Sequence, residues 1–284
     1  LETFHDRIRE AALGQIETPR LRQTHRRLAD VILAALQVPF DDLAREALGG
    51  GLADGSPSGV SISPRDWQRI FDLANHYSAA DEYDRALVFA LLAAEQARRQ
   101  HSLDIAERQY LIASQAPAGA DAATRYRIAR GLGEIRMRRG NYRAARQTLE
   151  GARHLAQGEP PLVTAEIEGI LGELAFKQGD MISASQAIER GLSQLGYTVP
   201  RRWATYAALV LWEIGVQTLH TWFPRQLVGR QARDDAQRDL LAVRLYSRLA
   251  RVFWFSRGTI KKFWAHLREL NLVERYAPTL ELAQ

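Results

Sequence analysis

One pattern of helix-packing residues occurs twice in this chain, at an offset of 39 residues (132 to 171). Residues 132–152 read LGEIRMRRGNYRAARQTLEGA, and residues 171–191 read LGELAFKQGDMISASQAIERG. Each copy has a central glycine followed by Asn or Asp, and small residues on either side of it. The central glycine ends a helix and lets the chain reverse, while the small residues let two helices approach closely. The pattern therefore predicts pairs of antiparallel helices with the spacing of a tetratricopeptide repeat.

The same template extends beyond these two copies. Placed at Trp67, it puts Ala74 at the small position of the first helix and Tyr83 just after the turn. A long helix from Tyr83 is expected to contact both of its neighbours. We expect consecutive helices at residues 67–79, 83–100, 103–116, 121–139, 142–156, 162–178 and 181–195. The predicted fold class is all-α, a right-handed superhelix of helical hairpins (a tetratricopeptide-like solenoid) with a short N-terminal helical segment.

The predicted array of repeats occupies residues 67–200. The residues before it divide into two parts. Residues 1–36 predict two short helices, 4–16 and 21–36, separated at Pro19. Residues 37–66 contain a glycine run and further Gly, Ser and Pro residues, which are typical of a flexible linker, with one short helix expected at 42–48. These glycines do not form a phosphate loop, because no lysine occurs before Lys177.

The composition changes after Pro200, and residues 201–284 are expected to continue the array. Helices are predicted at 201–222, 234–255 and 259–276. In the first, Glu213 and His220 lie on one stripe, and Trp212 lies on an opposite stripe of large apolar residues. We expect this helix to be amphipathic, with its apolar stripe in a soluble core rather than in a membrane.

Five of the six tryptophans lie between residues 203 and 264. Large rings at helical spacing usually belong to a protein core, which is the interpretation we favour. The alternative is a small-molecule sensor with an aromatic pocket in 203–264, lined by Trp203, Trp212, Trp254 and Trp264.

The ionisable residues narrow the function classes. The sequence has no cysteine, which excludes disulfides, thiolate metal sites and cysteine nucleophiles. The net charge of +5 comes from 38 basic residues, of which only three are lysine, and acidic residues are interspersed almost throughout. This distribution does not indicate a nucleic-acid-binding surface.

No catalytic pattern is present in the sequence. It has no Gly-x-Ser-x-Gly elbow and no dinucleotide-binding glycine pattern. His5-Asp6 is a dipeptide found in metal phosphohydrolases, but an Asp at this place is more simply a helix N-cap. The other histidines have no second ligand at metal-binding spacing. We therefore expect no catalytic residue, no metal, no cofactor and no ATP hydrolysis by this chain.

A stacked helical array offers a concave wall built from the first helix of each hairpin. Several cations close together on such a wall could hold an acidic segment or a terminal carboxylate. The alternative is that these long side chains are simply solvated. The template places the following residues on this predicted peptide-binding face: Arg127, Arg130, Glu134, Met137, Arg138, Glu173, Phe176 and Lys177.

Both ends of the chain carry a resemblance to a known group. Residues 4–36, with FHDRIREAAL and QTHRRLADVI, resemble the segment after the nucleotide-binding and winged-helix portions of bacterial STAND-type signalling ATPases. The tail LYSRLARVFWFSRG…FWAHLRELNLVERY is similar to their later tetratricopeptide region. In those proteins an effector, often a serine/threonine kinase or nucleotide cyclase, precedes a P-loop ATPase.

The resemblance implies a cytoplasmic, non-catalytic interaction or sensor module that regulates an attached signalling NTPase. Residues 1–36 would then be a helical remnant that follows the ATPase and winged-helix module, and 201–284 a truncated continuation. The chain starts at Leu1 without methionine and ends within a helical pattern, so we expect an excerpt of a larger protein. The implied partners are a protein or peptide segment and the upstream ATPase in cis, with no nucleic acid and no membrane.

Overall fold

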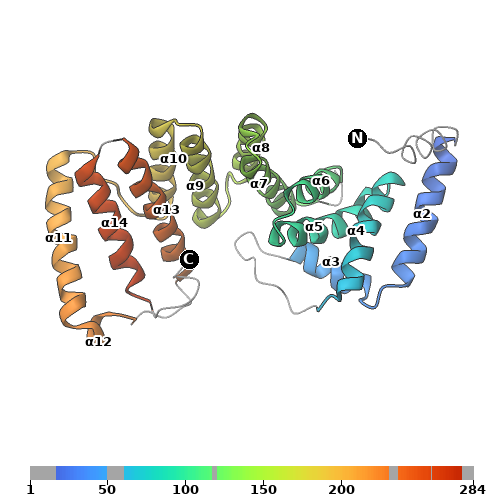
Figure 1. The fold of residues 1–284 in the computed structure, drawn as a ribbon, viewed down its shortest axis with the longest axis horizontal. Helices are drawn as coiled ribbons and strands as arrows, with labels where there is room; N and C mark the ends of the chain where they lie inside the picture. The colour runs from blue at the N-terminus through green and yellow to red at the C-terminus, as the bar shows by residue number, and fades with distance from the viewer. Residues whose placement is uncertain (1–16, 50–60, 117–119, 230–235, 257, 277–284) are drawn as a thin grey trace. The chain divides into compact units, whose positions relative to one another are not determined.

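The computed structural model describes residues 17–49, 61–116, 120–229, 236–256 and 258–276. Within these ranges the regular secondary structure consists of thirteen helices and no strand (Figure 1). Most helices pack on a sequence neighbour, as in the pairs α4/α5, α5/α6, α9/α10 and α13/α14, so the predicted all-α class of helical hairpins is confirmed. The predicted helix 4–16 and the dipeptide His5-Asp6 lie outside the described residues.

Most predicted helices agree with the observed ones to within a few residues. The short helix α12 is not predicted, because its four residues are too few to show helical spacing. The observed helices are α2 (Thr18–Ala34), α3 (Phe40–Gly49), α4 (Pro64–Ala79), α5 (Tyr83–Arg99), α6 (Leu103–Ala113), α7 (Ala122–Arg138), α8 (Tyr142–Leu155), α9 (Pro161–Lys177), α10 (Met181–Gln194), α11 (Trp203–Trp222), α12 (Pro224–Leu227), α13 (Ala236–Phe255) and α14 (Thr259–Val273).

The chain forms two compact units, Leu1–Asn141 and Tyr142–Gln284. The first unit contains α2 to α7, and the second contains α8 to α14. This division falls inside the first copy of the repeated pattern, 132–152, whereas the second copy, 171–191, lies wholly within the second unit. Each unit has its own apolar core.

Helix α5 is the centre of the first unit. Every side chain from Ala86 to Ala94 is buried, because α4 and α6 pack on two sides of α5 and α3 packs on a third. The expectation that this long helix contacts both neighbours is confirmed. Its run of alanines lets the neighbouring helices approach closely without leaving cavities.

Part of the stretch 37–66, expected to be a flexible linker, is a packed helix. The short helix expected at 42–48 is present as α3, and it packs on α5. Leu43 is fully buried and Ala47 nearly so. The glycine and proline content of the stretch obscured this apolar face, which is only two helical turns long.

Five of the turns between helices share one backbone geometry. Gly140, Gly179 and Gly196 follow α7, α9 and α10 with positive φ angles of 79°, 81° and 79°. The next backbone N–H then bonds a carbonyl five residues earlier, as in Asp180 N to Ala175 O at 3.0 Å. Asp81 and His101, with φ of 59° and 57°, take the same place after α4 and α5.

The α9/α10 pair has the close contact that the repeated pattern predicts. A Cβ added to Gly172 would lie 2.6 Å from Ile188 Cγ1 and 3.2 Å from the backbone oxygen of Ala184. Gly191 on α10 similarly faces the backbone oxygen of Ala165 at 3.0 Å. Gly133, singled out in the other copy, is buried. Glycine in α9 and α10 therefore serves close packing rather than flexibility.

The order of packing in the second unit differs from the order of the chain. The α13/α14 hairpin packs through α13 on α10 and α9, and α11 packs on α14 (Figure 1). Helix α11 is thus the outermost helix of this unit, although it directly follows α10 in sequence. None of the described helices is both long and apolar enough to cross a bilayer.

Helix α11 presents much of its apolar stripe outward, so the expectation that this stripe lies in the core is wrong for most of its large residues. Trp212 is 66% exposed and Leu219 is 48% exposed, whereas Leu209 packs against the core. The opposite stripe, which carries Glu213 and His220, faces α14 instead. The physical reason is that Arg268 and Asn271 of α14, and Glu274 just after it, are polar partners along that side.

Candidate interaction sites

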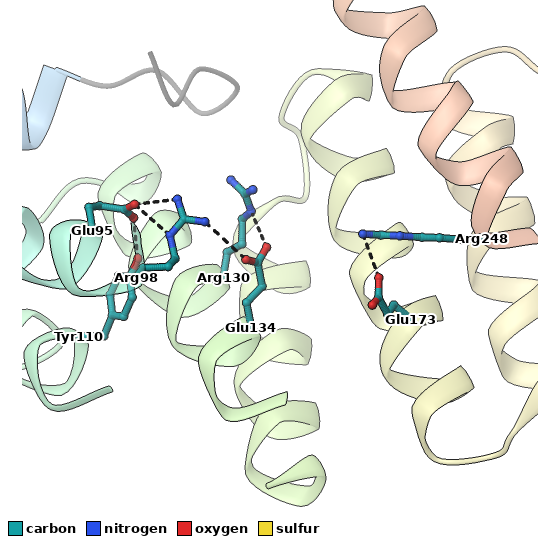
Figure 2. A network of polar contacts seen from close by, with 7 residues as sticks. All are labelled: Glu95, Arg98, Tyr110, Arg130, Glu134, Glu173 and Arg248. Carbon is teal, nitrogen blue, oxygen red and sulfur yellow. Dashed lines mark hydrogen bonds and ion pairs between the residues drawn. The ribbon is translucent and has the colours of Figure 1, made fainter. Parts of the chain in front are cut away.

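The predicted face residues on α7 join a network of charges within the first unit. Arg98 on α5 bonds Glu95 Oε2 at 2.7 Å and lies 3.9 Å from Glu134 Oε2 on α7 (Figure 2). Arg130 Nε lies 3.4 Å from Glu134 Oε1. Opposite charges thus alternate from α5 to α7: Glu134 links α7 to Arg98 on α5, and Arg130 pairs with Glu134 along α7.

The same network extends to α6 through a buried tyrosine. The hydroxyl of Tyr110 donates a hydrogen bond to Glu95 Oε1 at 2.5 Å. Burial opposes ionisation of Glu95, but Arg98 and the Tyr110 hydroxyl outweigh it and lower the pKa of this carboxyl. Burial, together with the Glu95 charge, raises the pKa of Tyr110 well above its usual value. Glu95 is therefore an ionised acceptor and Tyr110 a neutral donor.

Tyr110 also explains a glycine that the repeated pattern does not single out. A Cβ added to Gly131 on α7 would lie 2.4 Å from Tyr110 Cζ. The α6/α7 contact therefore requires a glycine at this position. The sequence signal was absent, because the corresponding position in the second copy, Ile170, is not small.

The other predicted residues of α7 have different environments. Arg127 donates a hydrogen bond to the backbone oxygen of Ala47 at 2.9 Å, which ties α7 to α3. Met137 is only 6% exposed and belongs to the core side of the helix. Arg138 is exposed at the end of α7. Of the five residues predicted on α7, Arg138 is the one that projects into solvent.

In the second unit, α13 lies against the predicted face of α9. Glu173 Oε2 pairs with Arg248 Nη2 at 3.0 Å. Phe176 packs edge-on against Phe255, with ring centroids 5.5 Å apart. Lys177 remains exposed at the end of α9. Glu173 and Phe176 therefore contact a neighbouring helix of the same chain instead of a wall open to a peptide.

A groove opens on the other side of α9, between α8 and α10. It has a volume of about 150 Å³ and an apolar floor that includes Leu174 and Ala187. Its rim is polar and carries two arginines, one from each flanking helix. The lining residues are Arg146, Glu150, Leu171, Leu174, Ala175, Ser183, Gln186, Ala187 and Arg190.

A buried carboxylate fixes the walls of this groove. Glu168 on α9 is 10% exposed and bonds Arg190 Nη2 on α10 at 2.9 Å. Its other oxygen lies 3.0 Å from Arg153 Nε on α8. Arg146, at the rim, donates a hydrogen bond to the neutral amide oxygen of Gln178. Ionic contacts thus join α8, α9 and α10 beside the groove, and Arg146 lies at its rim near the carboxylate of Asp180.

Sequence reasoning did not find this groove. The positions that line it belong to the second helices of the hairpins and to the opposite side of α9 from Glu173. The signal available was Glu168, an acidic residue flanked by apolar ones in α9, which indicates a buried ion pair.

The four tryptophans proposed as a pocket do not share one environment. Trp264 is 2% exposed and packs edge-on against Tyr206 and Tyr246 in the core, as the favoured interpretation expected. Trp203 and Trp254 are 75% and 65% exposed. Lys262 Nζ lies 3.8 Å above the ring of Trp254. These exposed rings do not have the enclosure that a small-molecule pocket gives its walls.

Comparisons with known proteins do not assign the chain to a family. No protein-family model and no curated protein matches the chain.

Metal-ligand groupings are also absent from the part of the chain that the structure describes, where no three His, Asp or Glu residues lie close enough together to hold a metal ion.

Two histidines contact each other: the Nδ1 atoms of His25 on α2 and His76 on α4 lie 2.8 Å apart. Burial, followed by the proximity of His76, lowers the pKa of His25. This pair joins α2 to α4, and its residues are too far apart in sequence for motif reasoning to connect them.

Proposed function

We propose that this chain is a non-catalytic interaction and sensor module that regulates an attached signalling NTPase. The observation that carries the proposal is the α8–α10 groove, with an apolar floor and an arginine at its rim. The helical-hairpin architecture supports it, since such arrays bind extended partners along their grooves. The resemblance to STAND-type ATPases supplies the NTPase part of the proposal.

The size of the groove favours a protein segment over a small cofactor. Sites for drug-sized molecules have volumes of about 300–1,000 Å³, whereas this groove has about 150 Å³. That volume accommodates one or two side chains of a peptide. A partner with an apolar side chain beside an acidic one would fill the floor and meet Arg146 at the rim.

The groove can be tested with peptides and two matched variants. A fluorescently labelled chain is applied to an array of short peptides in which one apolar residue is followed by an acidic or a neutral residue. We expect acidic peptides to bind, with weaker binding at high salt because the ionic contact is screened. Arg146→Glu should abolish this preference, while Arg143→Glu, at an exposed position of the same helix, should not.

Regulation of the ATPase is tested in a longer protein in which a P-loop ATPase domain precedes residue 1 of this chain. ATP turnover is measured with and without a saturating peptide taken from the array. A change in turnover that Arg146→Glu removes supports the sensor function. Unchanged turnover with a bound peptide would contradict regulation, and peptide binding that is insensitive to Arg146→Glu would contradict the groove.

A further inference from the structure

Helix α11 has an outer face that no described helix covers. Its three tryptophans, Trp203, Trp212 and Trp222, are 75%, 66% and 71% exposed. Leu211 and Leu219 lie between them and are 71% and 48% exposed. A large apolar patch of this kind marks an interaction site rather than ordinary protein surface.

The outer face is electrically neutral along its whole length. Helix α11 contains three ionisable residues, and all of them face inward. Tyr206 and Glu213 are 1% and 2% exposed, and Glu213 pairs with Arg268 of α14 at 3.0 Å. His220 is bonded to Glu274 at 2.6 Å. Because these polar contacts fix the rotation of α11, its neutral face must point away from the protein.

Basic residues stand at both ends of the neutral face. Arg201 and Arg202 are exposed just before α11, and Arg225 is exposed just after it. Lys261 also lies near the first end, where Glu189 is the acidic neighbour of Arg201 and Lys261. The first end of the helix therefore carries an excess of positive charge, and Arg225 places a cation at the second end, where Glu274 pairs with His220.

We propose that α11 docks on a membrane surface that contains anionic lipids. Its neutral face would lie in the plane of the interface, with the tryptophans at the level of the headgroups, which indole rings favour. Arg201, Arg202 and Arg225 would meet lipid phosphates at either end of the helix. This proposal departs from the expectation of no membrane partner, because much of the apolar stripe of α11 faces outward.

The charges distinguish this occupant from a second copy of the chain. If two copies paired through α11 in antiparallel orientation, Arg201 and Arg202 of one would face Arg225 of the other. Parallel pairing would place Arg201 against its own equivalent. Both arrangements bring like charges together, whereas an anionic surface neutralises them.

The proposal is tested by co-sedimentation of the full chain with vesicles. Phosphatidylcholine vesicles are compared with otherwise identical vesicles that contain phosphatidylglycerol. We expect binding to the anionic vesicles only, with a blue shift of tryptophan emission. Trp212→Ser should lower the partition coefficient about tenfold, because it removes one large side chain that would be buried in the membrane interface. Arg202→Glu should lower it about fivefold.

The controls are chosen at similar exposure away from α11. Trp254→Ser removes a ring that is 65% exposed on α13, and Arg143→Glu reverses a charge on α8; neither should change the partition. Absence of binding to anionic vesicles, or binding that Trp212→Ser does not weaken, would overturn the proposal. A dimer in light scattering that Trp212→Ser dissociates would assign the face to a second copy and overturn it as well. Arg146→Glu should leave vesicle binding intact, which separates this result from the peptide groove.

Discussion

The α9/α10 contact and the α11/α14 contact lie in the same unit but differ in the side chains at their closest approach. Between α9 and α10, glycines and aliphatic side chains pack closely, as at Gly172 and Ile188. Between α11 and α14, a buried carboxylate meets an arginine and an amide, as at Glu213. Helix α9 is buried on most of its surface, whereas α11 faces α14 with its polar side and exposes much of its apolar side. The side of a helix that faces inward thus depends on its neighbour as well as on its own stripes.

The sharpest test of this difference is to remove a charge from the polar contact. Arg268→Ala leaves Glu213 buried with Asn271 as its remaining side-chain partner. Removal of one member of a buried ion pair costs about 3–5 kcal/mol. We expect a loss near the lower end in the free energy of unfolding, measured by urea denaturation.

The matched control for this change is Arg248→Ala. Its partner Glu173 is 22% exposed, compared with 3% for Glu213, so water can replace part of the lost contact. We expect a loss below about 1 kcal/mol for this more exposed pair. Equal losses for the two variants would show that the α11/α14 contact is not a dry polar interface.

The apolar contact should respond to added volume instead. Gly172→Leu forces atoms into the position of Ile188 and should cost about 1–3 kcal/mol. Gly172→Ala should also destabilise, although less, because its Cβ would lie 2.6 Å from Ile188 Cγ1. Thermal unfolding measures both changes. Gly151→Ala on α8, where a Cβ meets nothing within 4 Å, is the control. An unchanged melting temperature for Gly172→Leu would mean that the two helices are not in this register.

A smaller and opposite effect is expected at the outer face of α11. A Cβ added to Gly215 would meet no atom within 4 Å. Gly215→Ala should therefore stabilise the second unit by about 0.5–1 kcal/mol, because alanine favours the helix and loses less backbone entropy. Urea denaturation again provides the measurement. Destabilisation would indicate that the outer face of α11 is already covered in solution.

The smallest expected effect concerns pH and the polar contact of α2. The pKa of His25 is lowered from 6.5 in the folded protein by burial and by His76. The unfolded chain therefore binds more protons than the folded one between the lowered pKa and about 6.5. Docking of α2 on α4 should be complete above this window and weaken as the pH falls through it.

Hydrogen exchange of α2, corrected for the intrinsic effect of pH, measures this weakening. His25→Gln should remove the pH dependence. His266→Gln, at a histidine with a side chain that is 67% exposed, should keep it. Equal pH dependence of α2 and of α9, which lacks histidine, would contradict a specific role of His25.

The sequence was sufficient for the helices, because glycine turns and helical spacing are local signals. It also identified the close approach at Gly172. It was not sufficient for the rotation of α11, which depends on the distant residues Arg268 and Asn271. For the same reason, the groove between α8 and α10 was missed: Glu168, Arg153 and Arg190 come from three helices. Contacts between distant segments leave no periodic trace in either partner.

The turn after α4 has a consequence for how such arrays diversify. Asp81 holds the left-handed position that glycine holds after α9, at some conformational cost. Its carboxylate in return accepts a hydrogen bond from the Tyr83 hydroxyl at 2.8 Å and pairs with Arg22 of α2 at 2.7 Å. A mutational step from glycine to aspartate at a hairpin turn can therefore recruit a neighbouring helix without altering the path of the backbone. Substitutions at turn positions would then make one repeat different from the next, because each turn side chain contacts a different neighbouring helix.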